Sequence, residues 1–94
     1  MKDIQDCPIK FKVSALNNKY FTEYPYTVFI NPKQYKNGVP AFTYTCKHMI
    51  TEDWIRDYFL YSTELKAAFA AIDRINKTMA VEIEKASLIQ HDPF

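Results

Sequence analysis

Glycine is nearly absent from the sequence, since Gly38 is the only one in 94 residues. Phosphate-binding loops and dinucleotide-binding turns each need several glycines, because the backbone must approach the phosphates closely. The chain therefore lacks the loops of the common nucleotide-dependent enzymes, and we expect no cofactor.

Cysteine and long uncharged runs are also scarce. The first six residues have no basic segment followed by an apolar one, so we expect that the protein is not exported. We therefore also expect Cys7 and Cys46 to be reduced thiols. Uncharged stretches such as 24–32 are far shorter than the roughly 20 apolar residues of a membrane helix. We therefore expect a cytoplasmic protein with no membrane partner.

What remains is an ordinary globular composition, with 48% hydrophobic and 24% charged residues. The length fits a single α+β domain over residues 1–94. Residue types with A/T-rich codons number 41, against 16 for the G/C-rich types. This bias indicates an A/T-rich coding source, which fits low-GC bacteria and their viruses.

The first half of the chain predicts strands and turns, because it holds the period-two patterns and four of the five prolines. Residues 9–15 alternate between apolar residues and Lys or Ser, which predicts a half-buried strand. A second strand is expected over 24–30, ended by Asn31-Pro32, and a third over 41–48. The third strand places Phe42, Tyr44, Cys46 and His48 on one face and Thr43, Thr45 and Lys47 on the other.

The second half predicts helices, because neither proline nor glycine occurs between residue 50 and Pro93. Thr51 followed by two acidic residues is typical of a helix start, so a first helix is expected over about 52–61. Ser62 or Thr63 caps the helical stretch that follows, over about 63–90. The predicted fold class is α+β: a three-stranded antiparallel sheet (residues about 9–48), followed by two or three C-terminal helices packed on one face.

The expected helix over 52–61 is aromatic on several sides, so one face can pack on the core while another stays exposed. Trp, Tyr and Arg are enriched at binding hot spots, which favours a protein-binding surface. An equal alternative is that sheet and long helix bury it on both sides. The predicted partner-binding residues are those of this helix, with a basic loop beside them: Trp54, Arg56, Asp57, Tyr58 and Tyr61, with Lys33, Tyr35 and Lys36.

Charge is unevenly distributed, although the net charge is only +1. Residues 1–50 carry +4 and residues 51–94 carry −3, and lysines and tyrosines are interleaved in the basic half. Aromatic rings beside cations favour single-stranded nucleic acid, because bases stack on the rings while lysines contact phosphates. The alternative function is therefore nucleic-acid binding on the strand face, through Lys10, Lys12, Lys19, Tyr20, Tyr35 and Lys36.

Metal binding and catalysis have little support. Cys46 and His48 share one side of a strand, and Cys7 with His91 would complete a set of four ligands, but the spacing matches no common zinc site. A Cys46–His48 nucleophile pair is the basis of a second alternative, a small enzyme. We expect no metal and no catalytic residues.

The long helix carries an apolar stripe with alternating steps of four and three residues, interrupted by Asn76. Packing on the sheet explains most of it, while an asparagine in such a stripe can specify the pairing of two helices, and the alanines at 67, 68, 70 and 71 would permit their close approach. A homodimer through this helix is therefore predicted, with an interface of Phe69, Ile72, Asn76, Met79 and Ile83.

The leading functional expectation is a small non-enzymatic protein-interaction module, an inhibitor of a host protein encoded by a phage or mobile element. This expectation is reached by eliminating other functions, because the sequence carries no cofactor-binding loop, no set of metal ligands and no paired catalytic groups. It has 16% aromatic residues, which favour binding surfaces.

Overall fold

The computed structural model describes residues 9–14 and 17–91, with side chains described as far as Ile83. Two residues of the predicted sites and strands, Cys7 and Ala15, lie outside the described residues. The elements are β1 (Lys12–Val13), β2 (Lys19–Glu23), β3 (Tyr26–Gln34), β4 (Pro40–His48), β5 (Trp54–Arg56) and α1 (Glu64–His91).

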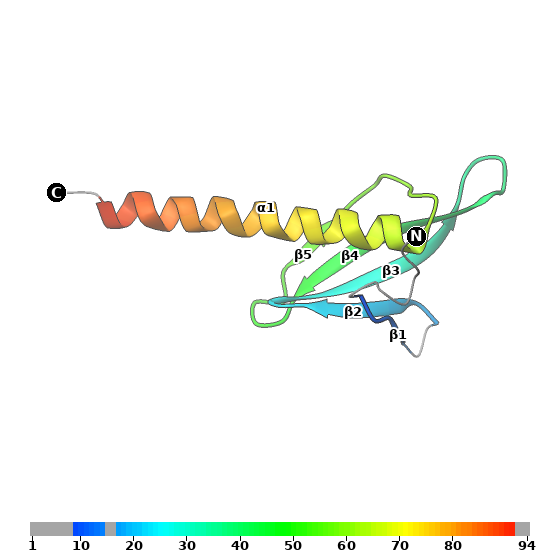
Figure 1. The fold of residues 1–94 in the computed structure, drawn as a ribbon, viewed down its shortest axis with the longest axis horizontal. Helices are drawn as coiled ribbons and strands as arrows, with labels where there is room; N and C mark the ends of the chain where they lie inside the picture. Colours follow the sequence, from blue (N-terminus) through cyan, green and yellow to red (C-terminus); the bar gives the residue numbers. More distant parts are fainter. Residues whose placement is uncertain (1–8, 15–16, 92–94) are drawn as a thin grey trace, which may run out of the picture.

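The five strands form one antiparallel sheet in the order β1-β2-β3-β4-β5, and α1 crosses one of its faces (Figure 1). The α+β class is confirmed, but the expectation of three strands and two or three helices is wrong. The structure has five strands and a single helix in its described part.

The predicted strand over 24–30 corresponds to the first part of β3, which begins only at Tyr26 because Tyr24 and Pro25 form a tight turn; β2, before that turn, was not predicted. β3 also continues through Asn31-Pro32, where we expected it to end. Beyond Ile30 it pairs only with β4, so one side of the strand is a sheet edge, where a residue without an N–H is tolerated. The predicted strand over 9–15 is shorter than expected, since only Lys12 and Val13 pair with β2.

The loop between β3 and β4 explains the position of the only glycine. Gly38 has a φ of 86°, a conformation that costs little only without a Cβ. Its N–H donates to the Tyr35 carbonyl, while the Tyr35 N–H donates to the Val39 carbonyl, both at 2.9 Å. These bonds close the β3–β4 hairpin.

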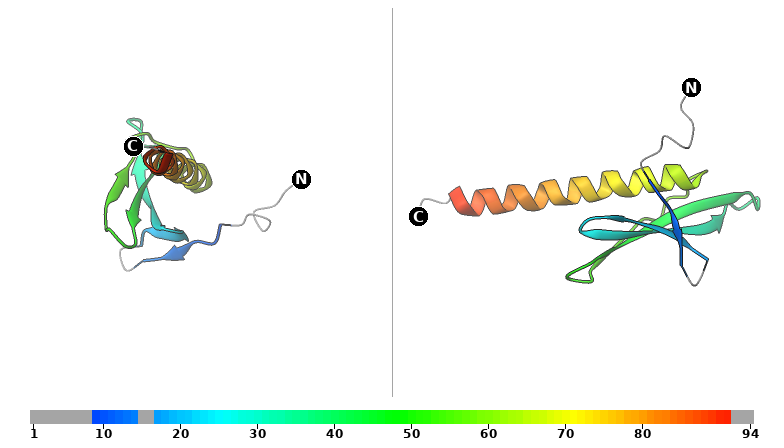
Figure 2. Two further views of the ribbon diagram at one scale, coloured as in Figure 1. Left: turned by 90° about the vertical axis from the view of Figure 1, so that its left-hand side faces the viewer. Right: turned by 60° about the horizontal axis from the view of Figure 1, so that its bottom comes forward.

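The core lies between α1 and the concave face of the sheet (Figure 2). Three alanines of α1 are fully buried, so the helix backbone approaches β3 and β4 closely. The sheet contributes alternate residues of its central strands, as the pattern over 41–48 predicted. The largest fully buried side chains are Tyr44, Ile30, Ile75, Val28 and Cys46.

The expected helix over 52–61 is wrong. Thr51 Oγ1 accepts a hydrogen bond from the Asp53 N–H, and Glu52 adopts a φ of 66°, so the capping residues form a turn. Trp54 and Ile55 then pair with the edge of β4 as β5. Apolar residues on every side of the expected helix left it no single face to bury, whereas a strand presents alternate residues to core and solvent.

The helix after residue 62 begins as predicted. Thr63 Oγ1 accepts a hydrogen bond from the Lys66 N–H at 3.0 Å, so Thr63 is the N-cap of α1. The helix runs uninterrupted past Asn76 to His91, and its C-terminal half projects beyond the sheet (Figure 1).

Candidate nucleic-acid interface

The face of the sheet opposite α1, which we call the open face, carries no covering helix in the described part of the chain (Figure 2). Strand pairing defines its members, because directly paired residues point to the same side. Its polar, charged and aromatic residues are Lys12, Tyr20, Thr22, Thr27, Phe29, Asn31, Lys33, Thr43, Thr45, Lys47, Trp54 and Arg56.

Three aromatic rings form a row across this face. The ring centroids of Tyr20 and Phe29 lie 6.0 Å apart, and those of Phe29 and Trp54 also lie 6.0 Å apart. The planes of the two pairs are inclined by 39° and 34°. Trp54 is 45% exposed, while Tyr20 and Phe29 are half-buried. The row therefore presents ring surface to solvent along a line from β2 to β5.

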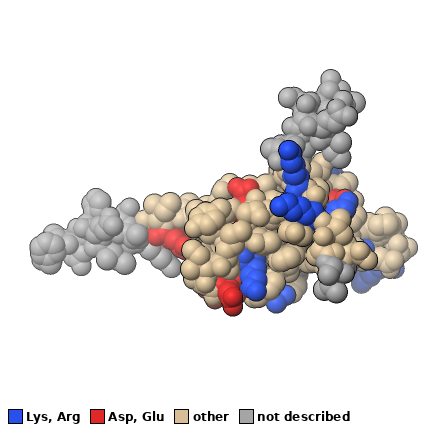
Figure 3. All heavy atoms as spheres, turned by 90° about the horizontal axis from the view of Figure 1, so that it is seen from below, with Lys and Arg blue, Asp and Glu red and all other residues tan. Residues whose placement is uncertain are grey.

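Cations flank the row. The Lys47 Nζ lies 5.7 Å and the Arg56 Cζ 5.2 Å from the centroid of the Trp54 ring, which holds both charges beside it. Lys12 and Lys33 are exposed on the outer parts of the same face. None of the open-face residues named above is acidic, although the chain has 11 acidic residues. Figure 3, which shows the molecule from below the view of Figure 1, has Lys and Arg atoms at several places, with Asp and Glu atoms among them.

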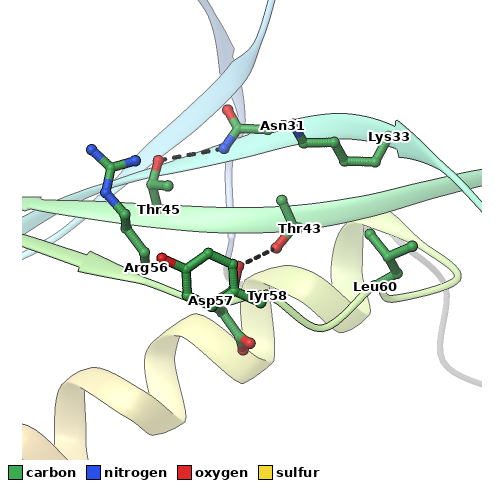
Figure 4. A pocket seen from close by; sticks show the side chains of 8 residues that line it. All are labelled: Asn31, Lys33, Thr43, Thr45, Arg56, Asp57, Tyr58 and Leu60. Carbon is green, nitrogen blue, oxygen red and sulfur yellow. Dashed lines mark hydrogen bonds between the residues drawn. The ribbon is translucent and has the colours of Figure 1, made fainter.

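A hollow of about 260 Å³ continues the open face toward the segment after β5. Asn31 and Thr45 face each other across β3 and β4, with the Asn31 amide donating to the Thr45 hydroxyl at 3.4 Å (Figure 4). Thr43 donates to the Asp57 carbonyl at 3.0 Å. The residues lining the hollow are Asn31, Lys33, Thr43, Thr45, Arg56, Asp57, Tyr58 and Leu60.

The Asp57 carboxylate points away from this hollow toward α1 (Figure 4). Partial burial alone would raise its pKa, but hydrogen bonds from the Phe59 N–H at 2.9 Å and the Tyr61 hydroxyl at 2.8 Å, together with one from Tyr44, lower it. Burial and the bond to Asp57 raise the pKa of Tyr61 to about 12 and also raise that of Tyr44. Asp57 therefore anchors the segment 57–60, with its carboxylate directed away from the hollow.

The predicted partner-binding residues do not share a helix face. Trp54 and Arg56 lie on the open face, and Asp57 and Tyr61 bond to each other. Tyr58 is 88% exposed in the loop after β5. The basic loop is separate from these: Lys33 lies on the open face, while Tyr35 and Lys36 lie in the β3–β4 hairpin.

The predicted nucleic-acid residues are divided between the two sides of the sheet. Lys12 and Tyr20 pair directly and lie on the open face, and Lys10 is exposed just before β1. Lys19 lies on the other face, where its Nζ bonds Glu64 Oε1 of α1 at 2.8 Å. Lys19 therefore connects sheet and helix.

Cys46 and His48 lie on the α1 side of the sheet, in different environments. Burial raises the pKa of the Cys46 thiol to about 12. The His48 Nδ1 accepts hydrogen bonds from the Ile50 and Thr51 N–H groups, each at 3.1 Å, which stabilises the turn after β4. Among the described residues, no three His, Cys, Asp or Glu side chains are grouped to hold a metal ion. The side chain of His91 lies outside the described part.

The predicted dimer interface lies at the margin of the helix–sheet contact. Ile72 and Met79 pack against the core, whereas Phe69 is 49% and Ile83 62% exposed, and Asn76 is also exposed. The alanines expected to admit a second helix instead contact the sheet at 67, 68 and 71.

Sequence reasoning placed Lys47 on the face opposite Cys46 but named neither Lys47 nor Phe29 as a candidate binding residue. The face of each residue follows from the alternation of side chains along a strand: Phe29 points to the side opposite Val28, and Lys47 to the side opposite Cys46. Their meeting with Trp54 could not be foreseen, because 54–56 was expected to be helical.

Comparison with protein-family models, curated proteins and solved structures found no match. No helix in the described part of the chain is both long enough and apolar enough to cross a lipid bilayer.

Proposed function

We propose that the protein binds single-stranded nucleic acid on its open face. The observation that carries this proposal is the row of Tyr20, Phe29 and Trp54, flanked by cations on a face whose described strand residues include no acid. Bases stack on aromatic rings regardless of sequence, and lysine and arginine neutralise the phosphates that follow them.

Single strands fit this surface better than duplexes. A base can stack on a protein ring only when it is free of its neighbours in a helix, and the row presents ring faces on a broad sheet rather than an element shaped for a groove. Trp54 is the most exposed ring of the row and is the principal stacking surface. Thr45, which pairs directly with Phe29, and Asn31 offer hydroxyl and amide groups to base edges or sugars.

The test is fluorescence anisotropy with labelled oligonucleotides of about 12 nucleotides, a length within the range that single-strand-binding modules cover. Replacing Trp54 by alanine should weaken binding about 5- to 150-fold, since a base–aromatic stack is worth about 1–3 kcal/mol. The matched control is Phe59→Ala, because Phe59 is a ring 74% exposed outside the row.

Salt dependence supplies a second measurement. The logarithm of the binding constant falls as the logarithm of the salt concentration rises. Removing a cation that neutralises one phosphate should make this slope less steep by about 0.7 for a single strand. Lys47→Ala should therefore flatten the slope, whereas Lys77→Ala should not, because Lys77 lies on α1 and pairs with Asp73. Absent binding, or binding insensitive to Trp54→Ala and to salt, would refute the proposal.

A second candidate is binding of a protein partner by the loop after β5. Tyr58 and Phe59 are adjacent and 88% and 74% exposed, beside a hollow that also includes Arg56 and Arg74. The inhibitor function expected from the sequence belongs to this candidate. This candidate is tested by a different variant: Tyr58→Ala would abolish capture of a protein partner while leaving oligonucleotide affinity unchanged.

A further inference from the structure

The side of α1 that borders its contact with the sheet carries a repeat that the core covers only in part. Phe69, Asn76 and Ile83 are spaced seven residues apart, and all three are exposed. Ile72 and Met79 lie between them in the repeat and are only partly covered by the core. Together these five residues form a seam with the four-three spacing of a two-stranded coiled coil.

The helix α1 is also longer than the part of it that packs on the sheet. At about 1.5 Å per residue, its 28 residues span about 42 Å, and Met79 is the last described side chain packed on the core. Residues 80–91 thus continue for about 18 Å beyond that contact (Figure 1). A helical segment of this length is marginal in water without tertiary packing. Its exposed apolar side chains include Val81 and Ile83, which are 49% and 62% accessible.

The position of Asn76 indicates what covers the seam. An apolar partner surface would leave its carboxamide without hydrogen bonds, whereas a carboxamide both donates and accepts and so pairs with its own copy. In parallel coiled-coil dimers a single asparagine at this kind of position sets the register by such a pair. The occupant that satisfies Asn76 and covers Phe69 and Ile83 at once is an identical helix in register.

We propose that the protein forms a two-fold symmetric dimer in which the α1 seams of two copies pair in parallel, with Asn76 facing Asn76 of the second copy. The seam and the open face lie on opposite sides of the sheet layer, so the dimer leaves both open faces accessible. This inference does not depend on the proposed nucleic-acid binding.

Sedimentation velocity at tens of micromolar protein tests the dimer. The wild-type chain should sediment as a dimer, and Ile83→Asp should convert it to a monomer with unchanged circular dichroism, because Ile83 is exposed within one copy. Val81→Asp is the matched control, since Val81 is a similarly exposed residue of α1 outside the seam and should leave the dimer intact. A monomeric wild type, or a dimer that survives Ile83→Asp, would overturn the proposal.

Cross-linking tests the register. In a Cys7→Ser background with oxidised glutathione as oxidant, Asn76→Cys should give a covalent dimer, because facing positions of a parallel pair bring the two thiols within disulfide reach. The neighbouring substitution Lys77→Cys points away from the seam and should stay monomeric on a denaturing gel. Equal cross-linking at both positions, or none at position 76, would exclude the in-register pair.

Discussion

On β3 and β4, successive residues point to opposite faces of the sheet, and the face decides the role of each residue. Val28 is fully buried under α1, while the next residue, Phe29, joins the aromatic row on the open face. The same division separates Cys46 from Lys47. A shift of one residue in strand pairing would exchange these sets, so the buried core also fixes the composition of the open face.

At the same scale, Cys46 is predicted to be chemically inert in the folded protein. Its thiol is fully buried and its pKa is raised to about 12, so the reactive thiolate is scarcely populated near neutral pH. In a Cys7→Ser variant, an aromatic disulfide reagent at about pH 8 should label Cys46 only after denaturant is added. Rapid labelling of the native protein would instead support the enzyme alternative built on Cys46 and His48.

The face of the sheet to which each strand residue points was predictable, because it depends only on the local alternation of side chains. The sequence predicted the two faces of 41–48, including the position of Cys46. It did not predict that Lys19 points toward α1, because the strand 19–23 was not recognised and its ion pair with Glu64 joins residues 45 apart. Such long-range contacts have no local signal.

At the scale of elements, β5 is the decisive difference between the sequence expectation and the structure. Thr51 and the acids after it are typical of a helix start, yet they form a turn that returns the chain to the edge of β4. The free edge of β4 offered backbone hydrogen bonds and the core offered a place for Ile55. Tertiary pairing outweighed local propensity. Trp54 consequently reaches the open face.

The start of α1 gives a prediction at this scale. Thr63→Ala removes the hydroxyl that accepts the Lys66 N–H, so the free energy of unfolding should fall by about 1 kcal/mol. Urea denaturation at one protein concentration measures the difference. The control is Ser62→Ala, an exposed neighbour that should change stability little. Equal decreases for the two variants would mean that Thr63 is not the cap.

At the scale of the whole molecule, the near-zero net charge conceals an uneven distribution of charge between the elements. The first 50 residues carry +4, and their strands supply Lys12, Lys33 and Lys47 to the open face. The helix α1, from the second half of the chain, carries equal numbers of acidic and basic residues, four of each. The near-zero net charge therefore coexists with a cationic surface that phosphates can approach.

The two proposals together predict that binding depends on strand length. A dimer with both open faces accessible should hold a long single strand at two places, so that the second contact is intramolecular and raises affinity by about 100-fold or more. Ile83→Asp, as a monomer, should bind an oligonucleotide of about 12 nucleotides as well as the wild type but lose this gain on one of about 40 nucleotides, while Val81→Asp should keep it. Anisotropy titrations with both lengths measure the ratio. If the wild type and Ile83→Asp gain equally from the longer strand, the two faces do not act on one strand, and the dimer seam serves stability rather than binding.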